Sequence, residues 1–213
     1  RVLTGVRYEK TEDTASGPLV DPAAVWQRNA AGTFLRNAAG ARIRKPEAGA
    51  AGSLEELRLI RREMGRTMNT SVDGFYPSLH LTYNFTPNFQ LRAAYARTYG
   101  RADFANVIPN TTIDENETYN PASPSPGSFP GVLIVGNPEL KPWIAQNYDL
   151  SAEYYTDQGG AVSGGVFLKE VRDFFGNFVK DATAADLETL GLDARYLGWR
   201  VTTKFNSGSA RVR

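Results

Sequence analysis

Residues 76–96 have the sequence YPSLHLTYNFTPNFQLRAAYA, in which polar and apolar side chains alternate on both sides of the turn Thr86-Pro87-Asn88. Successive side chains of a β-strand point to opposite faces, so this alternation predicts two strands. A connection of about three residues predicts that the two strands pair as an antiparallel hairpin.

The two faces of this hairpin differ in polarity. One face is apolar or aromatic throughout, with the predicted pairs Phe85–Phe89, Tyr83–Leu91, Leu81–Ala93 and Leu79–Tyr95. The other face is mostly polar, with the predicted pairs Asn84–Gln90, Thr82–Arg92, His80–Ala94 and Ser78–Ala96. Such a sheet can present one face to lipid and the other to water, or it can form half of a soluble sandwich.

The same alternation recurs along the chain and predicts six strands, at residues 2–10, 76–85, 89–99, 147–156, 162–172 and 199–209. Their lengths exceed the roughly 5 to 6 residues common in globular proteins and match the roughly 9 to 11 residues that cross a bilayer when tilted. Short turns near 86–88 and 157–160 alternate with long connections at 11–75, 100–146 and 173–198. Short turns at one rim and long loops at the other are typical of outer-membrane barrels.

Two further registers follow from the polarity pattern. In the second hairpin, a five-residue loop would set Leu150 beside Leu168, Ala152 beside Val166 and Asp149 beside Lys169. The last strand is expected to send Trp199, Val201, Thr203 and Phe205 to one face, with Arg200, Thr202, Lys204 and Asn206 on the other.

Aromatic side chains collect near both ends of the predicted strands. Phe85, Phe89 and Tyr83 lie at the short-turn end, and Tyr95, Tyr99 and Trp199 lie toward the long loops. This distribution is typical of the two aromatic girdles of a membrane barrel.

Composition excludes several classes of protein. The chain has no cysteine, a single histidine and a formal net charge of +1. Disulfide scaffolds, thiolate zinc sites and multi-histidine metal centres are therefore excluded, and no global field favours nucleic acid. The longest aliphatic run, Val132 to Val135, is far shorter than a membrane-spanning helix.

Short helices are expected within two of the long loops. Ser53-Leu54-Glu55-Glu56 is a capping-box pattern followed by helical spacing to Met64, and Thr183 can cap a second helix that ends before Gly191. Residues 121–127, which begin with Pro121, are expected to form a turn-rich connector within one domain.

Several passages resemble the barrel of TonB-dependent outer-membrane receptors. They are GVRYE at 5–9, YPSLHLTYN at 76–84, LRAAYAR at 91–97, GNPELKP at 136–142 with NYDL at 147–150, and FNSGSARV at 205–212. The run Asn-Pro-Glu-Leu-Lys-Pro is the most specific of these, and the passages extend over nearly the whole chain.

The resemblance implies an all-β fold: a segment of an antiparallel, up-and-down transmembrane β-barrel, with about six long strands and long extracellular loops. Residues 1–213 are then expected to be part of a barrel whose plug domain and remaining strands lie outside this chain. The implied location is the bacterial outer membrane. The implied function is energy-coupled uptake of a scarce nutrient such as a metal chelate, vitamin or glycan. The implied partners are outer-membrane lipid, the TonB coupling protein acting through the plug, and an unknown small ligand.

No enzymatic chemistry is predicted. His80 lies in mid-strand without a nucleophile elbow or triad spacing nearby, and no glycine loop precedes a helix as a phosphate site requires. The acidic stretch Asp114–Glu117 fails the calcium-loop pattern at Tyr119 and is expected to be a solvated part of an outer loop. No catalytic, cofactor-binding or metal-binding residue is therefore assigned, and no nucleic-acid partner is expected.

Five charged residues are candidates for a lumen-facing role, in contact with a plug, water or a charged ligand: Arg92, Asp149, Lys169, Arg200 and Lys204. The loop between Trp26 and Arg66 is a further candidate for ligand contact because it is rich in arginine and aromatic residues. Two other functions remain open at this point. One is a passive porin-like channel, and the other is a soluble β-sandwich binding module.

Overall fold

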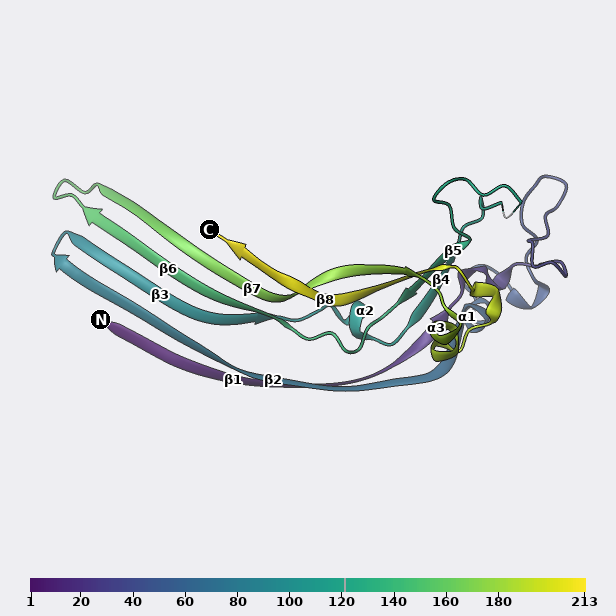
Figure 1. Ribbon diagram of the computed structural model, residues 1–213, viewed down its shortest axis with the longest axis horizontal. Coiled ribbons are helices and arrows are strands. Elements are labelled where there is room, and N and C mark those ends of the chain that lie inside the picture. The colour runs from purple at the N-terminus through teal and green to yellow at the C-terminus, as the bar shows by residue number, and fades with distance from the viewer. Residues whose placement is uncertain (121) are drawn as a thin grey trace.

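A computed structural model describes residues 1–120 and 122–213, and its main feature is one curved sheet (Figure 1). Within these residues the strands are β1 (Val2–Val20), β2 (Arg61–Thr86), β3 (Phe89–Gly100), β4 (Thr111–Glu115), β5 (Gly131–Val135), β6 (Trp143–Tyr155), β7 (Ala161–Asp181) and β8 (Arg200–Val212). The helices are α1 (Leu54–Ile60), α2 (Phe104–Val107) and α3 (Ala184–Leu190), with 3-10 turns η1 (Pro22–Val25), η2 (Pro46–Ala48) and η3 (Ala194–Tyr196). None of the helices in this part of the chain has the length and hydropathy of a membrane-spanning segment.

The all-β class is confirmed, and all six predicted strands are present. β1, β2 and β7 extend about ten residues or more into the predicted long loops at 11–75 and 173–198, and two short strands are added. β4 and β5 lie in the segment 100–146, which was expected to be a single loop. Residues 122–127 of the predicted connector lie between β4 and β5, while Pro121 lies outside the described residues.

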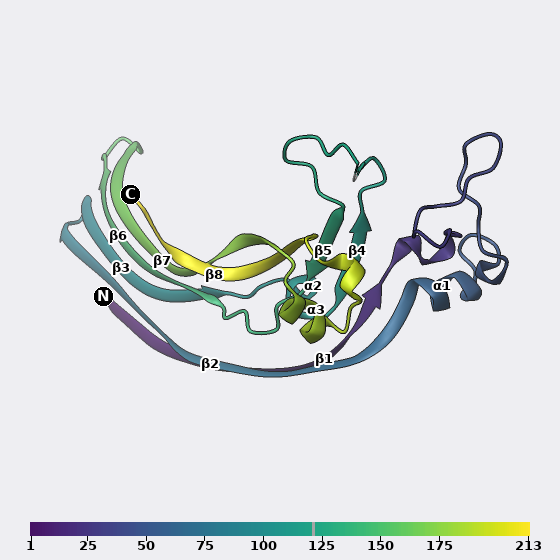
Figure 2. The ribbon, with the colours of Figure 1, turned by 45° about the vertical axis from the view of Figure 1, so that its right-hand side comes forward.

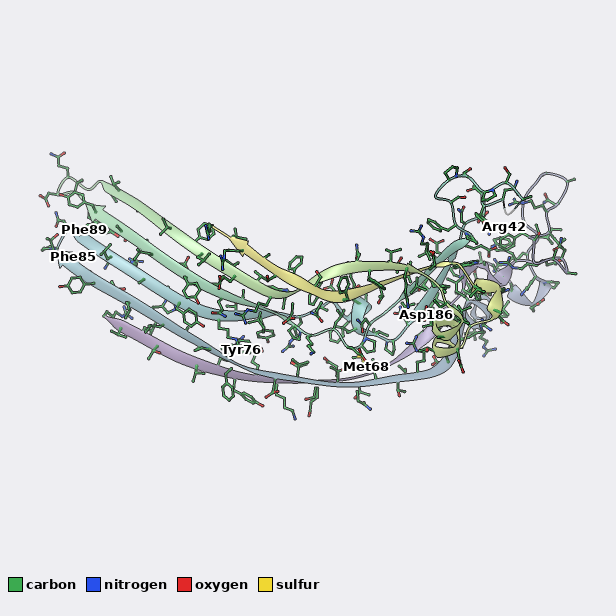
Figure 3. The ribbon with its side chains drawn as sticks, in the orientation of Figure 1. Arg42, Met68, Tyr76, Phe85, Phe89 and Asp186 are labelled. Atoms are coloured by element: carbon green, nitrogen blue, oxygen red, sulfur yellow. The ribbon has the colours of Figure 1, made fainter. Side chains whose placement is uncertain are left out.

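The strands form a hydrogen-bonded ring in the order β1-β2-β3-β6-β7-β8-β5-β4. The long strands pair antiparallel, whereas β4 joins β1 and β5 joins β8 through short parallel pairings. The ring closes only near the loops, where β4 and β5 stand between β1 and β8 (Figure 2). Toward the short turns the six long strands form an open trough, with Tyr76 and Met68 of β2 on its concave face (Figure 3).

The register of the first hairpin is confirmed from Ser78–Ala96 to Asn84–Gln90. At the turn the strands slip by one residue, so Thr86 and not Phe85 pairs with Phe89. Phe85 and Phe89 still approach, with ring centroids 5.6 Å apart.

The predicted register of the second hairpin is wrong by two residues. Leu150 pairs with Val166, and Asp149 pairs with Phe167, so Lys169 lies opposite Asn147. The loop does contain five residues, but it starts at Thr156 because the Thr156 hydroxyl accepts the Gly160 N–H at 2.8 Å. Gly159 supplies the left-handed conformation (φ 86°) that this turn needs. A slip of two residues keeps every side chain on its face.

Side-chain alternation reverses midway along β7 and β8. Asp173 (φ 58°) and Gly208 (φ 41°) both have left-handed backbones and lie opposite each other between the pairs Arg172–Ser209 and Phe174–Ser207. On one side of this point Glu170 and Arg211 share the convex face. On the other side Lys180 contacts Asp186 of α3 inside the ring, so the alternation has changed phase.

The ring encloses an apolar core formed by strands and by the α3 loop. Its buried residues are Leu19, Ile113, Leu133, Ala182, Leu187, Leu190, Tyr196, Trp199 and Val201. Trp199 is 7% exposed and packs edge-on against Tyr196, so its predicted place in an aromatic girdle is wrong. The phase change at Gly208 explains this, because it turns the face of Trp199 and Val201 inward.

Both predicted helices are present, and only the first differs in extent from the prediction. Ser53 caps α1 by accepting the Glu56 N–H at 3.2 Å, but the helix ends at Ile60 and Met64 belongs to β2. α3 has a complete capping box between Thr183 and Asp186, and Gly191 ends it in the left-handed conformation (φ 65°).

The contact between β1 and β4 predicts a glycine-dependent closure of the ring. A Cβ atom at Gly17 would overlap the backbone of Pro109 and Asn110, whereas one at Gly5 would lie 3.8 Å from Ser78 Oγ. Gly17→Ala is expected to lower the free energy of unfolding by about 1–3 kcal/mol, because a packed site must shift. Denaturant unfolding measures this, and Gly5→Ala in the same strand is the matched control. Equal stabilities of the two variants would contradict the expectation.

The α3 cap predicts a transition at low pH. Hydrogen bonds from Lys180 Nζ and from the backbone and side chain of Thr183 lower the pKa of Asp186 to about 2. Because this pKa is below the usual value of 3.8, the stabilisation is fully present above about pH 4 and is lost as the pH falls through about 2. Thermal unfolding across this range should show the loss. Asp186→Asn should flatten the profile, and Glu188→Gln on the same helix should leave it unchanged.

Candidate functional site

A pocket lies on the concave face, at the end of the trough nearest the loops. It has a cavity volume of about 130 Å³ and is bounded by β1, β2, the end of β3, α2 and the segment 136–142. The residues that line it are Glu9, Thr11, Asp13, Met68, Thr70, Val72, Tyr76, Tyr99, Arg101, Ala102, Phe104, Val107, Pro138, Leu140 and Pro142.

Two stacked tyrosines form the aromatic wall of this pocket. The rings of Tyr76 and Tyr99 lie 4.5 Å apart at an interplanar angle of 28°. Tyr76 can lie flat along β2 because Gly74 has no side chain, and a Cβ there would come within 2.7 Å of the Tyr76 hydroxyl. Tyr99 was expected in an outer aromatic girdle, and its place in this concave pocket corrects that prediction. β2 and β3 separate beyond the Ser78–Ala96 pair, which leaves space for the Tyr99 ring.

Charged groups form the rim of the pocket. Glu9 is 2.8 Å from Arg7 and 3.4 Å from Arg101, and Arg101 donates a hydrogen bond to the Tyr99 hydroxyl at 3.0 Å. Both arginines also lie within 6 Å of a tyrosine ring centroid, which favours cation–π attraction. Within residues 1–120 and 122–213, Asp13 has no cation within 4 Å. The rim therefore offers a carboxylate as well as guanidinium groups to a polar ligand.

The segment GNPELKP forms the opposite wall. Asn137 receives a 2.9 Å bond at its side-chain oxygen from the Glu139 N–H and donates to the Lys204 carbonyl at 2.9 Å. Thr70 of β2 donates to the Pro138 carbonyl at 3.1 Å, and Leu140 is buried. The motif thus connects β2 with β8 and holds one side of the pocket in place.

The five predicted lumen candidates lie outside this pocket. Arg92 and Asp149 border one shallow depression that also includes His80, and Arg92 pairs with Glu153 at 3.3 Å. Lys169 lies farther along the same concave face, opposite Asn147 and Val212.

Arg200 and Lys204 are on the face opposite to Val201, which points into the core, so they lie on the outer face and not on the predicted lumen face. Arg200 pairs with Asp181 at 3.3 Å and lies 5.0 Å from the Phe129 ring centroid, while the Lys204 backbone accepts Asn137. A plug or ligand contact by the other three candidates stays a prediction.

The loop after β1 contains a repeat that strand patterns do not detect. Residues 28–35 (RNAAGTFL) and 36–43 (RNAAGARI) form two similar turns, each with a left-handed glycine. The Asn29 side-chain oxygen accepts hydrogen bonds from the N–H groups of Ala31 and Thr33. In the second turn, the Asn37 side-chain oxygen accepts hydrogen bonds from Ala39 and Ala41. Backbone bonds of 2.9 Å run from Leu35 to Gln27, from Ile43 to Leu35 and from Gln27 to Ile43. These three bonds link Gln27, Leu35 and Ile43, which are spaced eight residues apart, into a closed cycle.

This loop is fastened to the end of β4 by ion pairs. Arg28 makes two contacts with Glu115, one of them 3.0 Å long, and Arg42 pairs with Glu117 at 2.8 Å. The Arg42 guanidinium (Arg42 is labelled in Figure 3) also lies 4.7 Å from the ring centroid of Trp26 and 5.2 Å from that of Phe34. The acidic stretch 114–117 therefore serves to anchor a neighbouring loop.

The sequence matches the family model described as TonB dependent receptor-like, beta-barrel, over residues 1–213. A comparison with curated proteins finds no match.

Among solved structures, the chain is similar to a mutant of the ferric enterobactin receptor PfeA from Pseudomonas aeruginosa, with 20% identity and a TM-score of 0.50 over 68% of this chain. It also matches the Serratia marcescens hemophore receptor HasR in complex with HasA and heme, with 12% identity, a TM-score of 0.49, and coverage of 99% of this chain and 27% of that one.

The likeness to PfeA concerns the fold. The chain spans 20% of the PfeA chain that it matches. Together with the long antiparallel strands and the family match over every residue, it leads to one assignment. This chain belongs to the TonB-dependent receptor-like β-barrel family.

Proposed function

We propose that this chain is part of an outer-membrane receptor that takes up a scarce nutrient with energy delivered by TonB. The family is described as TonB dependent receptor-like, and a solved structure similar in fold is a ferric enterobactin receptor. The observation that carries the proposal is the aromatic pocket on the concave face, close to the outer loops. A ligand bound there would be held on the inner side of the barrel wall and screened from lipid.

The convex face supports a membrane location. Its rows across β2, β3, β6 and β7 are apolar or aromatic from Phe85 to Leu79, and on β2 this band continues to Phe75. Ten residue steps from Phe75 to Phe85 span roughly 33 Å along the strand, or about 25 Å along the axis at a tilt of about 40°. This height matches the apolar band of outer-membrane barrels.

The pocket favours a ligand with a flat, partly apolar surface and polar groups at its edge. The Tyr76–Tyr99 stack provides an aromatic wall, Met68 and Leu140 provide apolar contact, and Arg101 and Asp13 provide charge. Among metal chelates, vitamins and glycans, aromatic chelates meet this description best. Ferric enterobactin, the ligand after which the receptor PfeA is described, is therefore a suitable first probe.

The concave face also suits a plug. Arg92, Asp149 and Lys169 project into the trough below the pocket, where charged side chains can bond to an enclosed domain. We assign these three residues to plug contact, and TonB would act through that plug.

Uptake of labelled ferric enterobactin by cells that express the full receptor tests the proposal. Uptake should disappear in cells that lack TonB. Uptake that persists without TonB would instead favour a passive channel, and no uptake would exclude this ligand while leaving heme as the next probe.

A substitution at Tyr76 tests the pocket itself. Tyr76→Ala should weaken binding of ferric enterobactin to the purified receptor by about 5- to 10-fold, since aromatic contacts of this kind contribute about 1 kcal/mol. Tyr76→Phe keeps the ring and should bind as the wild type does. Tyr83→Ala, in the same strand but on the convex face, controls for loss of any tyrosine. Equal binding by Tyr76→Ala and Tyr83→Ala would contradict a role for the pocket.

Adjacent alanines of β3 test the membrane location. Ala93 lies on the convex face between Leu81 and Leu150, and Ala94 lies on the concave face between His80 and Asp149. Ala93→Arg is expected to cost about 2–4 kcal/mol of unfolding free energy in lipid vesicles, because the charge enters the bilayer. Ala94→Arg should cost much less. Equal losses, or spin labels at Leu79, Leu81, Leu91 and Tyr95 that report water, would argue against lipid contact.

A further inference from the structure

A group of charged residues lies on the convex face immediately above the apolar band. The strand register brings Arg97 of β3 beside Gln146 of β6, Gln146 beside Glu170 of β7, and Glu170 beside Arg211 of β8. Arg172 lies one row farther toward the loops, on the same face. The row below contains Tyr95, Tyr148 and Leu168, so the change from apolar to charged is abrupt.

All residues of this charged group except Arg211 line a hollow of about 270 Å³. It is lined by Tyr95, Arg97, Ile144, Gln146, Glu170, Arg172 and Asp173. Arg97, Arg172 and Arg211, together with Tyr95 and Gln146, are called the convex arginine patch below. Its lower edge is the tilted Tyr95–Tyr148 pair, with ring centroids 5.2 Å apart.

The charges of the patch are only partly balanced. Arg211 donates to one oxygen of Glu170, Oε1, through Nε at 3.0 Å and through Nη2 at 2.5 Å. In the part of the chain that the structure describes, neither Arg97 nor Arg172 has a carboxylate within 4 Å, and both side chains are exposed. Asp173 contributes the second carboxylate of the hollow. Three guanidinium groups therefore face two carboxylates, one of which is already paired.

We propose that the convex arginine patch binds the phosphate-bearing headgroup of a lipid in the outer leaflet. Guanidinium groups match phosphate oxygens with paired hydrogen bonds, and their charge cannot be removed by deprotonation. The hollow lies where the headgroups of the bilayer meet the end of the apolar band, with tyrosines at the level of that boundary. The acyl chains of the same lipid would extend over Leu168 and then over the next row, where Val166 pairs with Leu150.

The function of the pocket is independent of this patch, because the two lie on opposite faces of the sheet. The inference rests on the proposed membrane location but on neither the ligand nor TonB. Measurements of bound lipid and of ferric enterobactin uptake therefore report separately.

The test compares lipid retention by the full receptor and its variants. Receptors are reconstituted in phosphatidylcholine discs that contain either lipid A with its phosphates or the same lipid without them. After extraction into mild detergent, the lipid retained per receptor is measured by mass spectrometry. The wild type should retain phosphorylated lipid A preferentially. Arg97→Gln combined with Arg172→Gln should reduce this retention about tenfold or more, because each arginine near a charged surface contributes about 1 kcal/mol.

Arg58→Gln combined with Arg61→Gln is the matched control, since it removes the same charge from α1 and the start of β2. This control should retain lipid as the wild type does. Equal retention of the two lipid forms by the wild-type receptor would overturn the proposal. Because this comparison uses no variant, a folding defect in a variant does not affect it. Displacement of the lipid by millimolar inorganic phosphate would also overturn the proposal, because the site would then be a simple anion site.

Discussion

The alternation of side chains along six long strands is the constraint on which the rest of this structure depends. Backbone groups in these strands are satisfied by the neighbouring strand, so polarity is decided by the side chains alone. Along most of β3, side chains at odd-numbered positions lie on the convex face and those at even-numbered positions lie on the concave face. The hydrogen-bonded register places the paired residues of β2 and β6 on the same face as their β3 partner. The apolar convex band and the polar concave trough are both results of this rule.

The rule is interrupted at one place, and the interruption builds the outer end of the molecule. The left-handed residues Asp173 and Gly208 face each other and reverse the alternation in both strands without changing their register. Beyond them, Val201 and Trp199 turn inward and meet Leu133 of β5 and Leu187 of α3. The loop end is thus a small packed core, while the remainder of the sheet is a wall with two solvent-facing or lipid-facing sides.

Local patterns in the sequence predicted the presence of the six long strands, the first hairpin and both helix caps, but not the loop-side halves of β1, β2 and β7. They failed where the outcome depends on contacts between distant segments. β4 and β5 are only five residues long each and are stabilised by pairing with β1 and β8, which no local pattern reveals. The pocket escaped prediction for the same reason, since its lining comes from four separate parts of the chain. The reversal at Asp173 carries little signal, because aspartate at a left-handed position is uncommon.

The ring of three backbone bonds in the loop after β1 also limits how that loop can change over time. Gln27, Leu35 and Ile43 each donate one bond and accept one, so the cycle is complete with two repeated octapeptides. Nearly identical tandem units invite unequal recombination, which adds or removes a whole unit at once. In this loop, adding or removing a unit would break the cycle of three backbone bonds and leave one N–H donor and one carbonyl acceptor without a partner. Point substitutions at the turn tips do not remove any of the three backbone bonds, so the loop tolerates changes of side chain more readily than changes of length.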